Sequence, residues 1–209
     1  LEVISRTGGG LDNVDIEAAT GRNVVVCGVK GPQDRFVAEH AVSLIMALAK
    51  QIFYLNKEVR KGNFKSRYEY RPMGLAGKRV GVMGLGRIGR IVAEMCHPLG
   101  MEVWGYDPYL NAEDLRLPGL VFTKEKEEII RTSDFLSLHV PLSRETQGLV
   151  GKKELDSMKP TAFLINTSRG EIIDEPALIE ALQQGKIAGA QVTEGKALRY
   201  GAIGAPVEQ

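Results

Sequence analysis

The sequence predicts an α/β fold with a doubly wound parallel sheet. Strand-like segments alternate with segments of helical periodicity from about residue 77 to residue 192. The strand-like segments are apolar throughout, which is typical of strands that helices cover on both faces of a parallel sheet. A glycine-rich turn joins the first of these strands to the helix that follows it. Together these three observations predict the fold class.

The elements of this sheet follow one another at the short spacing expected of strand–helix–strand units. The predicted strands are residues 79–83, 102–106, 121–122, 135–140, 162–166 and 187–192. The predicted helices are residues 87–96, 126–131, 153–158 and 175–184.

The N-terminal part reads as a separate, smaller unit. Residues 1–5 and 24–26 read as short strands, and residues 13–19 read as a short helix that Gly21 ends. The first strand leads into a loop of three consecutive glycines, a conformation that other residues adopt less freely. These are Gly8, Gly9 and Gly10.

One long helix is predicted to connect the two units. Apolar residues recur at helical spacing from Phe36 to about Arg60. Asp34 stands where it could cap the start of this helix. Residues 63–72 are polar and aromatic and read as a linker.

Composition excludes several classes of protein. The net charge is +1 with acids and bases mixed along the chain, which does not fit a nucleic-acid or anionic-membrane surface. The two cysteines, Cys27 and Cys96, have no metal-like spacing, and we expect no metal. We interpret the cysteines as reduced structural thiols of a cytoplasmic protein. No apolar run reaches membrane-spanning length. The chain starts at Leu1 and ends in loosely patterned residues 195–209, and we expect more protein on either side.

Residues 84–89 fit the dinucleotide-binding fingerprint G-x-G-x-x-G, with a strand before them and an apolar helix after them. Gly84 allows the tight turn, Gly86 lets the backbone approach a pyrophosphate, and Gly89 lets the helix pack closely on the sheet. The free N–H groups at the helix start favour phosphate charge. We expect Arg87 and Ile88, in the first helical turn, to contact the cofactor.

An acid follows the fingerprint at the expected distance. Asp107 ends the predicted strand 102–106, about 20 residues after the glycines. A carboxylate there accepts hydrogen bonds from the adenosine ribose hydroxyls. It also repels a 2′-phosphate, so the sequence predicts a Rossmann-type domain that prefers NAD to NADP.

With this site the chain resembles the D-isomer-specific 2-hydroxyacid dehydrogenases, and is most similar to their phosphoglycerate dehydrogenase branch. The resemblance covers residues 1–190 and rests on six segments. They are residues 5–15, Val37-Ala38-Glu39-His40, residues 84–89, Tyr106-Asp107-Pro108, His139-Val140-Pro141-Leu142 and Asn166-Thr167-Ser168-Arg169-Gly170.

The resemblance implies a domain organisation. Residues 1–35 correspond to part of a flavodoxin-like substrate domain, 36–73 to the connecting helix and linker, and 74–193 to the NAD-binding Rossmann domain. Residues 194–209 are a divergent tail. By analogy the long helix contributes to a homodimer.

The resemblance also implies roles for individual residues in hydride transfer between NAD and C2 of a small 2-hydroxy or 2-oxo acid. The substrate carboxylate binds the backbone N–H groups of Gly8, Gly9 and Gly10, with Arg6 available to hold a charged group nearby. Val140 and Pro141 line the adenosine pocket, and Thr167 and Ser168 lie beside the nicotinamide. Arg169 is the catalytic arginine.

The chemistry of Arg169 supports that last role independently. A guanidinium is always charged, and its planar fork matches the oxygens of a 2-oxo acid. Arg169 follows the predicted strand 162–166, so it lies at the carboxyl end of the sheet, where ligands bind. Taken alone, Arg169 would read as a surface arginine.

The chain departs from the family after Ala190. Family members continue with Asp-Val-Phe, a Glu-Pro and a Pro-His segment, which supply the glutamate and histidine of the acid–base pair. No histidine follows His139 in this sequence, and the surroundings of Glu194 do not match. We interpret His40 and His97 as structural, and we expect His139 by the adenosine site. We therefore expect impaired or absent turnover.

Three interpretations stay open. The chain is a dehydrogenase or a piece of one, a non-catalytic NAD-binding regulator resembling corepressors of the same fold, or a degenerate product of a frameshift, splice alternative or truncation. The substrate also stays open among a phosphorylated acid, glycerate, glyoxylate and lactate.

Overall fold

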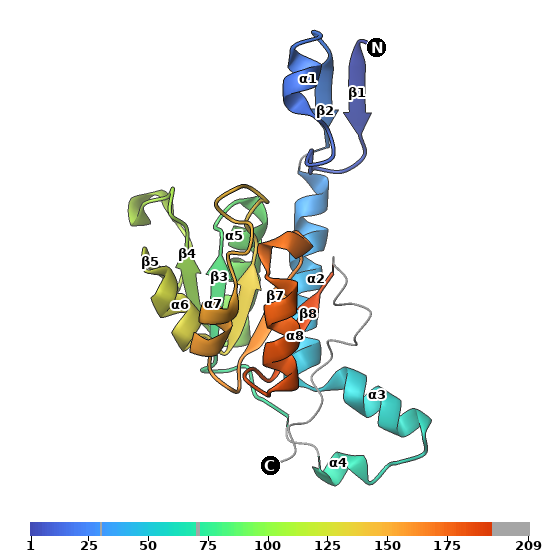
Figure 1. The fold of residues 1–209 in the computed structure, drawn as a ribbon. Coiled ribbons are helices and arrows are strands. Elements are labelled where there is room, and N and C mark those ends of the chain that lie inside the picture. The colour runs from blue at the N-terminus through green and yellow to red at the C-terminus, as the bar shows by residue number, and fades with distance from the viewer. Residues whose placement is uncertain (30, 70–71, 194–209) are drawn as a thin grey trace.

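The structure is a computed structural model that describes residues 1–29, 31–69 and 72–193. It contains two parallel sheets, one of two strands and one of six (Figure 1). The predicted tail 194–209 and the acid Glu194 lie outside the described residues. The predicted domain boundaries at residues 35, 73 and 193 stay a prediction.

The six-stranded sheet is the doubly wound parallel sheet that the sequence predicts. Its strands are β3 (Arg79–Met83), β4 (Glu102–Tyr106), β5 (Leu120–Thr123), β6 (Phe135–Leu138), β7 (Phe163–Asn166) and β8 (Gly189–Val192). They lie in the order β5-β4-β3-β6-β7-β8, so the winding reverses between β3 and β6. Ligands bind at such a reversal, outside the carboxyl ends of the strands.

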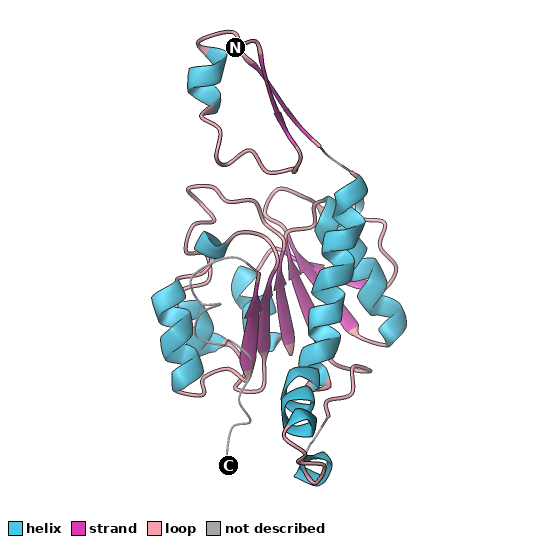
Figure 2. Ribbon diagram, turned by 90° about the vertical axis from the view of Figure 1, so that its right-hand side faces the viewer, coloured by secondary structure: helices cyan, strands magenta, loops and turns pink. Residues whose placement is uncertain are grey.

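Helices cover both faces of this sheet (Figure 2). They include α2 (Pro32–Ala49), α5 (Arg87–Cys96), α6 (Lys126–Thr132), α7 (Lys152–Ser157) and α8 (Glu175–Gln183), with short 3-10 turns η1 (His97–Leu99), η2 (Ala112–Asp114) and η3 (Gly170–Ile172). Val80 and Val82 of β3 belong to a core under α2 and α5, whereas Met83 belongs to a second core on the opposite face. This alternation explains why the strands are apolar at every position.

Three predicted elements agree with the structure at both ends, namely residues 79–83, 87–96 and 102–106. The other predicted elements of the large sheet are present with ends displaced by one or two residues, the usual uncertainty of helix and strand ends.

The prediction of a single long helix is wrong. The chain forms α2 and then α3 (Ile52–Arg60), with a bend of 61° between them. Gln51 adopts a left-handed conformation (φ 46°). Met73, which comes later in the chain, donates its backbone N–H to Ala49 O at the end of α2 at 2.9 Å. The apolar periodicity continues through the bend because α3 is itself amphipathic. Sequence spacing therefore could not locate the break.

Two further local predictions need correction. Asp34 does not cap the connecting helix, because Gly31 precedes α2 and the Asp34 side chain pairs with Arg87 instead. The predicted linker 63–72 contains a short helix, α4 (Ser66–Glu69).

The N-terminal unit consists of β1 (Val3–Arg6), α1 (Ile16–Thr20) and β2 (Val25–Gly28). Asp15 caps α1 by accepting a hydrogen bond of 2.8 Å from Ala18 N. Val3 and Val25 are 51% and 57% exposed, so one face of this small sheet is uncovered, as expected from its few strands. Figures 1 and 2 show the unit beyond one end of the large sheet, joined to it by α2.

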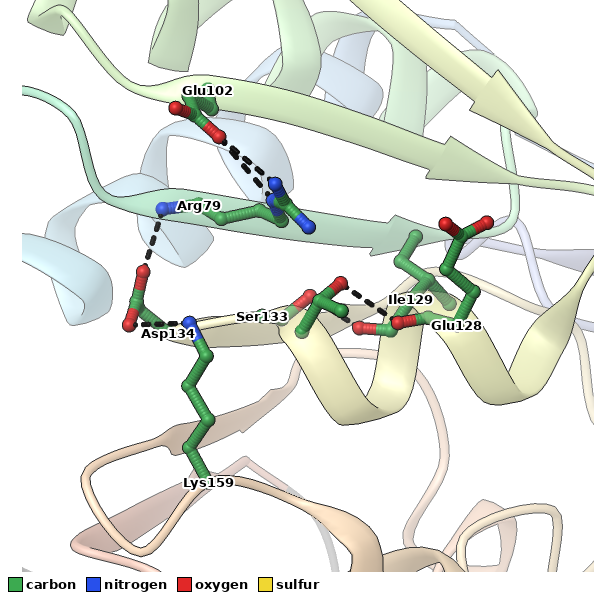
Figure 3. A network of polar contacts seen from close by, with 8 residues as sticks. Arg79, Glu102, Glu128, Ile129, Ser133, Asp134 and Lys159 are labelled. Carbon is green, nitrogen blue, oxygen red and sulfur yellow. Dashed lines mark hydrogen bonds and ion pairs between the residues drawn. The ribbon is translucent and has the colours of Figure 1, made fainter.

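A polar network ties the amino ends of the strands together (Figure 3). Asp134, just before β6, accepts hydrogen bonds from Arg79 N at 2.8 Å and from Lys159 Nζ at 2.9 Å. Its backbone oxygen accepts from Phe163 N of β7 at 2.9 Å. Burial opposes ionisation of the Asp134 carboxyl. The hydrogen bonds from Arg79 N and Lys159 Nζ nevertheless hold its pKa below the ordinary value. Through its side chain and its backbone oxygen, Asp134 thus links the starts of β3, β6 and β7.

Among the described residues no single helix is long and apolar enough to span a membrane. Only α2 and α3 taken together reach the required length and composition, and the 61° bend separates them.

Candidate cofactor and substrate site

The glycine turn after β3 has the geometry that the fingerprint predicts. Gly84 has a φ of 90°, and a Cβ there would lie 2.7 Å from His139 O. A Cβ on Gly89 would collide with Gly84 O, so this glycine permits the close approach of α5 to the turn. Gly86 differs from both, because a Cβ there would meet no atom within 4 Å. The open space beside Gly86 is where a ligand can approach the backbone.

Asp107 stabilises this glycine turn through hydrogen bonds to the backbone and also lines a cavity beside it. Its Oδ2 accepts a hydrogen bond of 3.0 Å from Leu85 N, and its Oδ1 accepts one of 3.0 Å from Tyr109 N. The carboxylate that we predict to bind a ribose is therefore oriented by the backbone of the fingerprint itself. Each carboxylate oxygen keeps further acceptor capacity.

Two adjoining cavities lie at the carboxyl ends of the strands. The first, the Asp107 cavity, has a volume of about 790 Å³ and is lined by Gly84, Asp107 and Thr146 among others. The second, the Arg169 cavity, has a volume of about 650 Å³. Four residues line both cavities and join them: Gly86, His139, Val140 and Pro141.

The Arg169 cavity brings together distant parts of the chain. Its lining includes the predicted residues Arg6, Gly8, Gly9, Gly10, Arg87, Ile88, Thr167, Ser168 and Arg169. Of all the predicted site residues, only Gly89 lines neither cavity, since its role is to pack α5 on the turn.

Arg169 is held at the cavity wall by an acid from the N-terminal unit. Its Nε donates to Asp12 Oδ2 at 2.6 Å, and its Nη1 donates to Ser168 O at 2.9 Å. On the same loop, Arg6 donates to Gly10 O through Nη1. Sequence reasoning quoted Asp12 within a family segment but gave it no role. Its partner is 157 positions away, and no local pattern signals that contact.

Asn166 shapes the loop that carries Arg169. This buried side chain donates to Arg169 O at 2.8 Å and accepts from Ser168 N at 3.0 Å. The hydroxyl of Ser168 in turn donates to Leu138 O at 2.9 Å. These bonds curl residues 166–169 at the end of β7 and direct Arg169 into the cavity. Asn166 was not among the predicted site residues.

Two buried polar atoms at this wall have no partner among the described residues. They are Nδ1 of His139 and Oγ1 of Thr167. Buried polar groups in folded proteins are usually paired, so both atoms mark places where a ligand can hydrogen-bond. The hydroxyl and amide groups of a dinucleotide offer such partners. Together with the open space at Gly86, these atoms fit a bound NAD.

His139, which we expect by the adenosine site, lines both cavities at their boundary. Its Nε2 is 2.8 Å from Ser137 Oγ. Burial lowers the pKa of His139 to about 4, so the imidazole is neutral at neutral pH. A neutral imidazole of such low pKa is a poor proton donor for a substrate oxygen.

Arg87 also meets an acid from outside the Rossmann sheet. Its Nε lies 2.5 Å from Oδ2 of Asp34, in the first turn of α2. The described residues contain no group of three metal-binding side chains.

The model of the family described as D-isomer specific 2-hydroxyacid dehydrogenase, NAD binding domain, matches residues 42–196. A D-3-phosphoglycerate dehydrogenase from Archaeoglobus fulgidus is 40% identical over 190 residues, covering 91% of this chain and 36% of the relative. A glyoxylate reductase from Thermococcus litoralis is 40% identical over 196 residues, covering 91% of this chain and 59% of the relative.

Solved structures agree with these matches. A D-lactate dehydrogenase from Aquifex aeolicus, crystallised with NAD and lactic acid, superposes with a TM-score of 0.87 at 33% identity, covering 94% of this chain and 58% of the other. The chain thus spans only 36% of the phosphoglycerate dehydrogenase and little more than half of the lactate dehydrogenase. With the family model matched over most of its length, the chain belongs to the D-isomer specific 2-hydroxyacid dehydrogenases and contains their NAD-binding domain.

Proposed function

We propose that this chain is part of an enzyme that transfers hydride between NAD and C2 of a small 2-hydroxy or 2-oxo acid. One observation carries the proposal. A single cavity is lined both by the glycine loop and Arg169, which suit an organic acid, and by Gly86 and Arg87 of the dinucleotide fingerprint. The two reactants of such a transfer would therefore meet in one place.

Residues of both cavities would hold the cofactor. Asp107 would accept hydrogen bonds from the adenosine ribose between the apolar walls of Val140 and Pro141. The pyrophosphate would lie against Gly86, where the backbone is open, and the nicotinamide half beside Thr167 and Ser168. When bound, NAD supplies or accepts the hydride.

The substrate would lie between the glycine loop and Arg169. The backbone N–H groups of Gly8, Gly9 and Gly10 can donate to a carboxylate, and Arg6 stabilises the loop through Gly10 O. The guanidinium of Arg169 would orient the acid and polarise its C2 oxygen. Asp12 on its Nε restricts the rotation of the guanidinium, which preorganises it for this role.

We further propose that residues 1–209 bind both ligands but turn over slowly. A histidine acid in this reaction should titrate near neutral pH, whereas the pKa of His139 is about 4. The low pKa supports a role for His139 as a neutral hydrogen-bonding residue in cofactor binding. The second candidate function is an NAD-binding regulator without turnover, since His139 is the one histidine among the described residues that line the Arg169 cavity.

Titration of the purified chain with NADH, followed by fluorescence, tests the cofactor proposal. A panel of glyoxylate, pyruvate, hydroxypyruvate and its phosphorylated form, added to the NADH complex, then tests the acid. Saturable NADH binding that a 2-oxo acid tightens supports the proposal. Absence of NADH binding by a folded chain would contradict it.

Consumption of NADH in the same mixtures separates the two candidate functions. Steady oxidation of NADH by one of the acids indicates a competent enzyme and contradicts slow turnover. Tight binding of NADH without consumption favours the regulator.

A further inference from the structure

Arg87 begins the fingerprint helix and is the exposed cation at the proposed pyrophosphate position. Its side chain is 59% exposed, and it lines the Arg169 cavity with Gly86 and Ile88. An exposed arginine samples many rotamers, and binding a phosphate then requires one of them to be selected. A second group that fixes the guanidinium beforehand would reduce this loss.

Asp34 is such a group. Its side chain is only 12% exposed, and its Oδ2 lies 2.5 Å from Nε of Arg87. The acid belongs to α2 and the arginine to α5, and these helices pack against each other through one buried core that includes Ala38, Ala41 and Val92. The position of the carboxylate is therefore set by helix packing rather than by a mobile loop.

The pairing leaves the phosphate-binding edge of Arg87 available. Only Nε is engaged by Asp34, and Nη1 and Nη2 have no partner among the described residues. These two nitrogens form the planar fork that matches two oxygens of a phosphate. The fork lies beside the start of α5, where free backbone N–H groups and the helix dipole already favour an anion.

We propose that Asp34 is a positioning residue for the cofactor, which holds Arg87 by its Nε so that the fork meets the dinucleotide pyrophosphate. The inference rests on the proposed placement of that pyrophosphate. Asp34 lines the Arg169 cavity as well, and the role proposed for it is to act through Arg87. It stands outside the fingerprint, 53 positions before its partner, and therefore extends the cofactor site to the connecting helix.

Because Asp34 is negatively charged, the proposal predicts the direction in which it changes cofactor affinity. A carboxylate near a pyrophosphate repels it when nothing intervenes. Asp34 should therefore strengthen binding while Arg87 is present and weaken it, or have no effect, once Arg87 is removed. A purely structural role would act alike in both backgrounds.

The main comparison uses Asp34→Ala, Arg87→Gln, the double variant, and Glu39→Ala as matched control. Glu39 is also an acid of α2, paired only on the surface with Arg35. The ligands are NADH, ADP-ribose, which keeps the pyrophosphate, and adenosine, which lacks it. Affinities are measured by calorimetry at two salt concentrations.

We expect Asp34→Ala to weaken NADH and ADP-ribose by ~5- to 10-fold, with adenosine unchanged within about twofold. In the Arg87→Gln background the same change should leave affinity unchanged or raise it by up to ~3-fold. Glu39→Ala should change nothing beyond about twofold. The loss in Asp34→Ala should shrink at high salt.

Equal losses from Asp34→Ala in both backgrounds, or a parallel loss of adenosine affinity, would overturn the proposal, since either result indicates a structural effect. Unchanged ADP-ribose affinity in Asp34→Ala would overturn it too. If the unmodified chain bound adenosine but neither NADH nor ADP-ribose, the placement of the pyrophosphate itself would be wrong. Arg87→Lys keeps the charge but lacks Nε, so adding Asp34→Ala to it should cause no further loss.

Discussion

The two ends of the six-stranded sheet differ in whether their buried polar groups have hydrogen-bond partners. At the amino end, both carboxylate oxygens of Asp134 are paired, and Arg79 bonds Glu102 (Figure 3). The Arg79 guanidinium also lies 4.1 Å from the centre of the Trp104 ring. At the carboxyl end, His139 Nδ1 and Thr167 Oγ1 are buried without partners among the described residues. A satisfied network stabilises a fold, whereas unsatisfied groups keep capacity for a ligand. The amino end therefore serves stability and the carboxyl end serves binding.

Gly86→Val should separate the two ends most strongly. The added side chain meets no atom within 4 Å and Gly86 has a φ of −69°, so the fold should accept it. It would fill the space proposed for the pyrophosphate, and we expect NADH affinity to fall more than ~100-fold with unfolding free energy within about 1 kcal/mol. Calorimetric titration and denaturant unfolding measure both. Retained NADH affinity would mean that no ligand occupies this space.

Arg169→Ala should show the same separation for the substrate. Loss of the fork should lower 2-oxo acid affinity by ~100-fold while NADH affinity stays within about threefold. Quenching of bound NADH by the acid measures the first, and direct titration measures the second. If acid binding survives, the substrate lies elsewhere.

The pH dependence of stability should distinguish the ends because their groups titrate in different ranges. The folded-state pKa of His139 is lowered from 6.5 to about 4, so the unfolded chain binds the proton more readily between these values. Unfolding free energy should therefore decrease by ~1–3 kcal/mol as the pH falls from about 6.5 to 4. Asp134, whose folded pKa is lowered from 3.8, keeps its contribution until the pH falls below that range.

Denaturant unfolding across pH, with His139→Gln as reference, measures this effect. The variant should lose the slope in that range and keep the decline at lower pH. An identical slope in both proteins would show that His139 is not the group responsible.

Asp134→Ala should affect stability alone. It removes the acceptor for Arg79 N and Lys159 Nζ, and leaving these half-buried donors unpaired should cost about 1–2 kcal/mol. Glu102→Ala removes a carboxylate that is 55% exposed from the same network and should cost less than about 1 kcal/mol. Chemical denaturation compares the two. A change in NADH affinity in Asp134→Ala would contradict the proposal that the amino end of the sheet serves stability alone.

Asp107→Ala should affect NADH binding less than Gly86→Val does. We expect NADH affinity to fall by ~10-fold because the acceptor for the ribose hydroxyls is lost. The preference for NADH over NADPH should relax because a charge that repels the 2′-phosphate is removed. Since Asp107 also accepts from Leu85 N and Tyr109 N, some loss of stability should accompany it. Parallel titrations with NADH and NADPH measure both affinities. Unchanged affinity for each would remove Asp107 from the site.

Local patterns predicted the elements near the fingerprint well. Residues 79–83, 87–96 and 102–106 agree with β3, α5 and β4 because continuous apolar runs, helical spacing and three glycines all indicate the same boundaries. The connecting helix was predicted wrongly, since its break depends on a contact from Met73 to Ala49 that comes from a later part of the chain.

The sequence by itself determined the parallel sheet, the glycine turn with Asp107 at its expected distance, and the arginine that ends a buried strand. These features follow from residue type and short-range spacing, which the chain carries in order. Only the tertiary structure decided that Asp12 holds Arg169, that Asp34 holds Arg87 and that the His139 imidazole is neutral. Those pairings join residues 157 and 53 positions apart, and the pKa depends on burial by other segments. Packing brings such groups together, and no local spacing encodes it.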